Sequence, residues 1–171
     1  MKIKTVVALA AVSVAALLWG GCKVSYTFSG ASISPLAKTH SVAYFPNNAP
    51  MVAPMLSTTF TDALQDKFQR MTKLTYTREN GDLAFDGEIV GYMITPTAIT
   101  ADERAAKMRL TISVRVRFAN AIEPQYNFER TFSQYEDYDS SQMLQSVEGT
   151  LIPTIVEKLV NDVFNAAVSN W

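Results

Sequence analysis

An alternating segment in the middle of the chain constrains the fold more than any other feature. In residues 109–118, polar residues alternate with the apolar residues Leu110, Ile112, Val114, Val116 and Phe118. Successive side chains of a β-strand point to opposite faces, so this pattern predicts a strand with one face on a core and the other in solvent. Such a half-exposed strand is typical of antiparallel sheets. We therefore expect a sheet that is covered on one side.

Two segments have the spacing of amphipathic helices. Pro54 suits the first turn of the earlier helix, whose apolar stripe is Leu56, Phe60, Ala63, Leu64, Phe68 and Met71. The later helix is expected to be capped by Asp139, Ser140 or Ser141, and its stripe is Met143, Leu144, Val147, Leu151, Ile155, Leu159, Val163, Phe164 and Ala167. Pro153 should disturb the later helix, because proline removes a helix hydrogen bond, and a new cap at Thr150 would limit the damage.

Three further segments are predicted to be strands: residues 39–45, residues 82–94 after the Asn80-Gly81 turn, and residues 126–135. Residues 95–106 form a long loop. The predicted order is β-α-β-β-β-α, an α+β domain with two helices packed on one face of a four-stranded, mostly antiparallel sheet. Its core should bring together Leu110, Ile112, Val114, Val116, Phe60, Leu64, Ile155 and Leu159.

The amino terminus is typical of a cleavable bacterial signal. Lys2 and Lys4 precede an apolar run that ends at Gly20-Gly21-Cys22 and is shorter than the roughly 20 residues of a spanning helix. Small residues before a cysteine suit a lipoprotein signal peptidase, although Trp19 stands where leucine is usual. An ordinary secretory signal with an incidental cysteine is the alternative. We predict a lipoprotein signal peptide at residues 1–21, lipid attachment at Cys22, a lipidated tether at residues 22–38 and one domain at residues 39–171.

Composition excludes several classes of function. Removing Lys2 and Lys4 from the 15 basic residues leaves 13 against 16 acidic ones, so the mature chain lacks the positive field expected of a nucleic-acid-binding protein. His40 is the only histidine and Cys22 the only cysteine, so there is no metal-site spacing and no Cys/His nucleophile pair. There is also no glycine-rich phosphate loop. We expect no enzyme, no metal and no cofactor.

A basic cluster allows two interpretations. Arg109, Arg115 and Arg117 share the polar face of the central strand, and Arg104 and Lys107 lie in the loop before it. The first interpretation is ion pairing across strands, at about 0.2–1 kcal/mol for each pair. Its expected partners are Asp86, Glu88 and Glu129. The second is an anion site, because a guanidinium matches two phosphate oxygens at once. Spacing alone favours ion pairing.

Four blocks of the sequence resemble one known family. They are Ser25-Tyr26-Thr27-Phe28-Ser29-Gly30-Ala31-Ser32-Ile33; Phe45-Pro46-Asn47-Asn48-Ala49-Pro50 with Leu56-Ser57-x-x-Phe60-Thr61-x-Ala63-Leu64; Asn80-Gly81-Asp82-Leu83-x-Phe85-x-Gly87-Glu88-Ile89-x-Gly91-Tyr92; and Asp137-Tyr138-Asp139-Ser140-Ser141-Gln142. Together they are similar to the LptE-type lipopolysaccharide-assembly lipoproteins over nearly the whole mature chain. Gly149 and Pro153 depart from the uninterrupted last helix expected of that family.

The resemblance implies a function that composition could not. Proteins of this family are anchored by lipid in the cell outer membrane, facing the periplasm, plug the lumen of the LptD β-barrel and assist lipopolysaccharide transport to the cell surface. It implies that basic residues on the sheet and its loop contact lipopolysaccharide, which gives the anion interpretation of the arginines equal weight. It also makes the 95–106 loop a candidate for the barrel interior. The alternative is a lipoprotein adaptor subunit of another envelope or secretion complex, without lipopolysaccharide contact.

Overall fold

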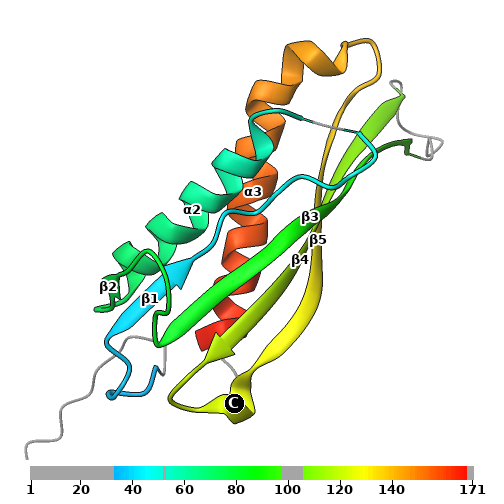
Figure 1. The fold of residues 1–171 in the computed structure, drawn as a ribbon. Coiled ribbons are helices and arrows are strands. Elements are labelled where there is room, and N and C mark those ends of the chain that lie inside the picture. The colour runs from blue at the N-terminus through cyan, green and yellow to red at the C-terminus, as the bar shows by residue number, and fades with distance from the viewer. Residues whose placement is uncertain (1–32, 52, 98–105, 169–171) are drawn as a thin grey trace, which may run out of the picture.

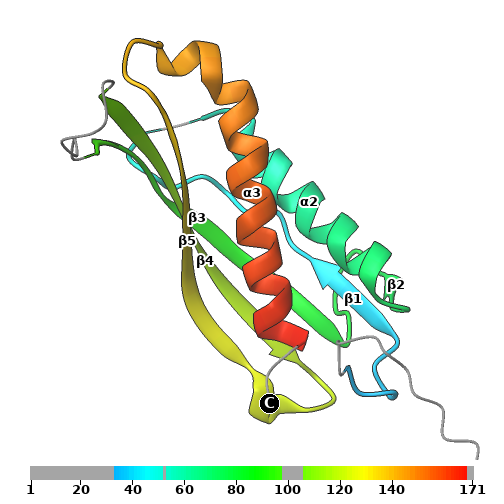
Figure 2. The same ribbon diagram turned by 180° about the vertical axis from the view of Figure 1, so that it is seen from behind.

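The computed structural model describes residues 33–51, 53–97 and 106–168. Helices α2 (Leu56–Met71) and α3 (Leu144–Val168) lie on the same side of a sheet (Figures 1 and 2). The strands are, in chain order, β1 (Thr39–Val42), β2 (Thr75–Tyr76), β3 (Leu83–Pro96), β4 (Lys107–Asn120) and β5 (Phe128–Asp139). A short 3₁₀ turn, η1 (Pro124–Tyr126), precedes β5. The architecture is α+β, with two helices on one face of a sheet.

The sheet is mixed and has five strands, in the spatial order β2-β1-β3-β4-β5. The prediction of four mostly antiparallel strands is therefore wrong in number and in part of the pairing. Strand β2 has only two residues, held by pairing of Thr75 and Tyr76 with β1, so it has no alternating pattern of its own. Strand β1 is parallel to both neighbours because α2 provides the crossover that parallel pairing needs. The β3-β4-β5 part is antiparallel.

The predicted core is confirmed. Every apolar residue of the alternating segment is buried on β4, and its partners on both helices are fully buried. Rings of four phenylalanines continue this core across the sheet, with centroid separations of 4.5 Å for Phe68–Phe85, 4.9 Å for Phe85–Phe118 and 5.2 Å for Phe118–Phe128. The two helices therefore cover one face, and the polar residues of β4 lie on the other.

The last helix begins later than predicted. Strand β5 continues to Asp139, which pairs with Lys107, so the expected cap residues belong to the strand end and the turn after it. The Asp139 carboxylate accepts hydrogen bonds from the Ser141 backbone N–H at 2.8 Å and from its hydroxyl at 2.6 Å, as in an Asx turn. Helix α3 then starts at Leu144.

Pro153 lies inside α3 and does not end it. The helix is continuous past Thr150, so the predicted restart at that residue is wrong. The turns before Pro153 are set at an angle to the rest of α3 (Figures 1 and 2), a bend that the missing proline N–H explains. The proline is exposed and points away from the sheet core, so its ring does not disturb the packing of Ile152 and Ile155, which are buried beside it.

Candidate functional site

The face of the sheet that the helices leave uncovered carries the basic side chains of β4 that were proposed as candidates from the sequence. In the register of the sheet, Arg117 lies between Asp86 on β3 and Glu129 on β5, and Arg115 lies beside Glu88. Arg109 lies near the other end of β4, opposite Asp137 of β5. Thr111 and Ser113 separate Arg109 from the other two arginines, so the three do not form one continuous cluster.

Arg109 is held in place by a carboxylate and an aromatic ring. Its Nε donates to Asp137 Oδ1 at 2.7 Å and its Nη2 donates to Asp137 Oδ2 at 3.0 Å, a two-point contact. Its guanidinium carbon also lies 3.7 Å from the centroid of the Tyr135 ring. The bond to Asp137 raises the pKa of Arg109, and the same contact lowers the pKa of Asp137. Arg109 therefore has two of its five donors engaged by Asp137, and its guanidinium is fixed against the Tyr135 ring.

Arg115 and Arg117 differ in how fully they are engaged. Arg117 contacts both oxygens of Asp86, through Nε at 3.1 Å and Nη2 at 2.5 Å, and this contact raises the pKa of Arg117. Arg115 donates to Glu88 only through Nη1, at 2.9 Å. The other Glu88 oxygen accepts from the Asn48 side chain at 2.6 Å. Arg115 is therefore the arginine of the row with the most unused donors toward the solvent.

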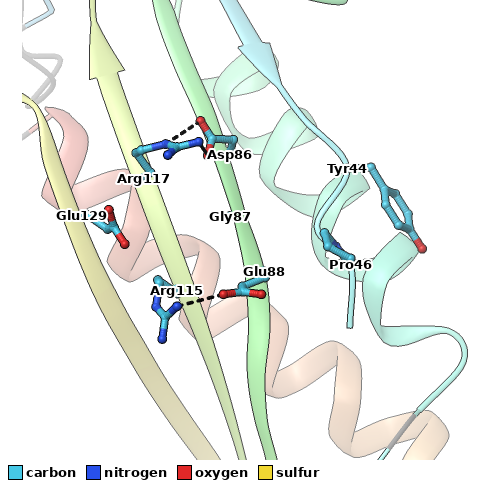
Figure 3. Close-up of a pocket in the computed structure, with 8 residues that line it drawn as sticks. All are labelled: Tyr44, Pro46, Asp86, Gly87, Glu88, Arg115, Arg117 and Glu129. Carbon is cyan, nitrogen blue, oxygen red and sulfur yellow. Dashed lines mark hydrogen bonds and ion pairs between the residues drawn. The ribbon is translucent and has the colours of Figure 1, made fainter. Parts of the chain in front are cut away.

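A shallow depression of about 520 Å³ surrounds these two arginines (Figure 3). Its lining residues are Tyr44, Pro46, Asp86, Gly87, Glu88, Arg115, Arg117 and Glu129. Tyr44 and Pro46 lie along one side, beyond β3, and the two ion pairs cross from β4 to β3 (Figure 3). The segment carrying Tyr44 and Pro46 is bound to β3 by backbone hydrogen bonds, from Ala43 N–H to the Phe85 carbonyl at 2.8 Å and from Ile89 N–H to the Pro46 carbonyl at 2.9 Å. The depression is thus built into the sheet.

The ion-pair interpretation of the sequence is confirmed for Asp86 and Glu88. Glu129, the third expected partner, faces Arg117 in the register and attracts it, but forms no hydrogen bond or ion pair among the residues that the structure describes. The sequence did not predict Asp137 as the partner of Arg109, because the register that places them opposite each other depends on the length of the β4–β5 connection. Lys107 begins β4 opposite Asp139. Arg104 and Cys22 lie outside the described residues.

The described part of the chain offers few other candidate functional groups. His40 is fully buried, between the rings of Phe68 and Tyr76. Across residues 33–51, 53–97 and 106–168, no three His, Cys, Asp or Glu side chains are grouped as a metal site would require. In the same residues, neither helix has both the length and the apolar character needed to cross a membrane.

A comparison with protein-family models identifies the family of this chain. The family model described as "LptE: Lipopolysaccharide-assembly" matches residues 37–167. No curated protein matches the chain. Among solved structures, a minor lipoprotein from Acinetobacter baumannii is 13% identical with a TM-score of 0.47, covering 78% of this chain and 94% of that one. An uncharacterised lipoprotein B from Nitrosomonas europaea is 13% identical with a TM-score of 0.42, covering 75% and 81%.

Proposed function

The chain belongs to the LptE family of lipopolysaccharide-assembly proteins, and from this membership we propose that it plugs and supports an LptD-type outer-membrane barrel and assists lipopolysaccharide transport to the cell surface. The observation that carries the proposal is the extent of the family match. Residues 37–167 run from just before β1 almost to the end of α3, so the match includes every helix and strand described. The likeness therefore concerns the whole domain and not one motif.

The proposal includes lipid attachment at Cys22 and residence in the outer membrane, facing the periplasm and the barrel lumen. Cys22 follows an apolar segment and two glycines, as a lipidated cysteine should. Lys23 and Val24 follow it, in place of the aspartate that retains lipoproteins at the inner membrane in some bacteria. One acyl chain binds a membrane only weakly, whereas two or more give a stable anchor.

The open face of the sheet is the proposed contact with lipopolysaccharide, through Arg104, Lys107, Arg109, Arg115 and Arg117. Their contacts distinguish the three arginines of β4 from one another. Arg109 and Arg117 already use two donors each on a carboxylate, whereas Arg115 uses one. A phosphate that took the place of Asp137 on Arg109, or of Asp86 on Arg117, would leave that carboxylate without its partner. The cost of the unpaired carboxylate would offset much of the binding free energy gained from the phosphate. Arg115 is therefore the arginine through which this face should first engage a ligand.

Co-purification tests this function. An affinity-tagged chain, extracted with mild detergent from the outer membranes of its own bacterium, should bring down a large β-barrel protein as its single stoichiometric partner, together with lipopolysaccharide. A tagged lipoprotein of unrelated family serves as the control for adventitious membrane capture. Recovery of a multi-component secretion complex, with no large barrel, would show that the chain is an adaptor of another envelope machine.

A further inference from the structure

The depression around Arg115 and Arg117 has a mixed set of hydrogen-bonding groups. It contains two guanidinium groups, which only donate, and three carboxylates, which only accept when ionised. An exposed tyrosine lies at its edge. We infer that this depression binds a sugar ring of lipopolysaccharide through its hydroxyl groups, and not a phosphate. The inference rests on the proposed function, because it names the part of the lipopolysaccharide that this surface recognises.

The charge balance of the depression disfavours a bare anion. A phosphate accepts hydrogen bonds and carries negative charge, so Asp86, Glu88 and Glu129 repel it while Arg115 and Arg117 attract it. Glu129 is the clearest case, because it forms no ion pair within the described residues and its charge is therefore not offset by direct contact. A hydroxyl group donates one hydrogen bond and accepts others, so it can use both kinds of group at once.

Arg115 and Glu129 have hydrogen-bonding groups that are placed to bind a ligand with hydroxyl groups. Arg115 engages Glu88 through Nη1 alone, so its Nε and Nη2 can donate to hydroxyl oxygens. Glu129, which forms no hydrogen bond or ion pair with the described residues, presents its carboxylate on the β5 side, where a hydroxyl can donate to it. The two ion pairs hold Arg115 and Arg117 in position beforehand. Arg115 Nη1 lies 2.9 Å from Glu88, and Arg117 lies 3.1 Å from Asp86 through Nε and 2.5 Å through Nη2. A ligand therefore binds without first ordering these long side chains.

Tyr44 supplies an apolar surface next to these polar groups. Tyr44 is 62% exposed, although it lies on a segment fixed to β3. A sugar ring has an apolar face of C–H groups that packs on an aromatic ring, while its hydroxyl groups project sideways to polar partners. The volume of about 520 Å³ falls in the range of roughly 300–1,000 Å³ that is usual for small-ligand sites. The depression has room for a short run of sugar units.

Titration calorimetry with two probes tests the inference. The protein is the chain from residue 22 onward with Cys22→Ser, which contains every described residue and cannot be acylated. The probes are lipopolysaccharide oligosaccharide from the source bacterium, freed of acyl chains and phosphate, and inorganic phosphate. We expect the oligosaccharide to bind and equal concentrations of phosphate not to displace it. Tyr44→Ala and Arg115→Gln should each weaken binding about tenfold, in line with the loss of one strong contact.

Glu129→Gln gives the sharpest distinction, because it removes a charge without breaking an ion pair within the described residues. A sugar site loses a hydrogen-bond acceptor of full charge, so binding of the oligosaccharide should weaken. An anion site loses a repulsive charge, so binding of intact lipopolysaccharide would strengthen instead. Arg70→Gln is the matched control, because Arg70 also forms an exposed ion pair, with Asp66 at 3.0 Å, but on helix α2. It should leave binding unchanged.

The outcomes separate this inference from the proposed function. If intact lipopolysaccharide binds but the phosphate-free oligosaccharide does not, the sugar site is wrong and the family role stands. Stronger binding by Glu129→Gln would likewise replace the sugar site with an anion site. If Tyr44→Ala or Arg115→Gln abolishes barrel co-purification and no oligosaccharide binds, this face docks on the barrel and the inference is overturned. Failure of both lipopolysaccharide binding and barrel co-purification would refute the proposed function itself.

Discussion

His40 is buried and has no charged partner among the described residues, where both of its ring nitrogens also lack a hydrogen bond of standard geometry. Its ring lies 5.9 Å from that of Phe68 and 5.7 Å from that of Tyr76, measured between centroids. Burial lowers the pKa of His40, an effect that the backbone of Gln65 only partly opposes. The folded protein therefore holds this histidine neutral at pH values where the unfolded chain would protonate it.

This burial predicts a specific dependence of stability on pH. Below the ordinary histidine pKa near ~6.5, the unfolded chain binds a proton that the folded chain does not, so the free energy of unfolding should fall as the pH falls. The slope from this one group is at most about 1.4 kcal/mol per pH unit. Urea unfolding between pH 7.5 and 5 should show the decline, and His40→Leu should remove most of it. An equal slope in the variant would assign the decline to other groups.

The carboxylates act in a different pH window. Hydrogen bonds from the Lys38 and Thr39 backbones and from the Thr39 hydroxyl lower the pKa of Asp82, the Lys38 bond contributing most. The stabilisation from such a group is present above its ordinary pKa and disappears only as the pH falls through the lowered one. Acid unfolding through Asp82 therefore begins well below the range in which His40 titrates, and the two effects can be measured separately.

Gly87 shows how a single residue shapes the open face. Its φ is 155°, and a Cβ there would lie 2.0 Å from the Arg115 carbonyl oxygen and 2.8 Å from the Phe45 ring. No other residue fits without moving β3 away from β4. The close approach of these strands sets the span that the Glu88–Arg115 ion pair bridges, so Gly87 shapes the depression that it helps to line.

At the scale of elements, β4 organises the molecule. It pairs along its length with both β3 and β5, buries one face beneath the helices and exposes the other. Alternation along this strand therefore determines both the core and the proposed site. Any shift of register by one residue would exchange the two faces.

Val114→Asp tests this assignment of faces. Val114 is fully buried, so an aspartate there would place a charge without a partner in the core, and we expect the free energy of unfolding to fall by about 3–5 kcal/mol or the protein not to fold. The matched control is Ser113→Asp, one residue earlier, where the side chain faces outward and its hydroxyl forms a hydrogen bond with the Ser133 hydroxyl at 2.7 Å. It should cost less than about 1 kcal/mol. Equal melting temperatures for the two variants would contradict the assignment.

At the scale of the whole molecule, the first described residues lie at the end of the domain where both helices finish, away from the end where α3 begins (Figure 1). The Asp82 carboxylate fixes this entry point. It accepts from the backbone N–H groups of Lys38 and Thr39 at 2.8 and 2.9 Å and from the Thr39 hydroxyl at 2.9 Å. An anchor attached at Cys22 would therefore hold the domain by one defined end.

Cys22→Ser tests the anchor. Without the thiol no acyl chain can be attached, so the variant should lose incorporation of a fatty-acid analogue and be found as uncleaved precursor or as soluble periplasmic protein. The domain itself should be unaffected, because every described element lies beyond residue 32, and its melting temperature should match the wild type. Undiminished labelling of the variant would place the lipid elsewhere or exclude it.

The sequence by itself determined the layers of this protein. The strand period of residues 109–118 and the helical stripes at residues 56–71 and 144–168 gave the right core, because apolar residues at those periods can be buried on only one face. Two of the three expected ion-pair partners, Asp86 and Glu88, also followed from the sequence, since neighbouring strands with opposite charges on one face tend to pair. The family blocks indicated the family, which periodicity alone could not.

Only the tertiary structure decided the rest. Strand β2 forms because it pairs with the edge of β1, and β5 extends to Asp139 because Asp139 pairs with Lys107. Neither strand boundary can therefore be predicted from a local sequence pattern. Hydrogen bonding between strands likewise set the start of α3. The pairing of Arg109 with Asp137, the position of the Glu129 carboxylate beside Arg117, and the depression lined by Arg115, Arg117 and Tyr44 all depend on register across strands that are distant in sequence. Local propensity acts over a few residues, whereas register is fixed only when the whole sheet closes on its core.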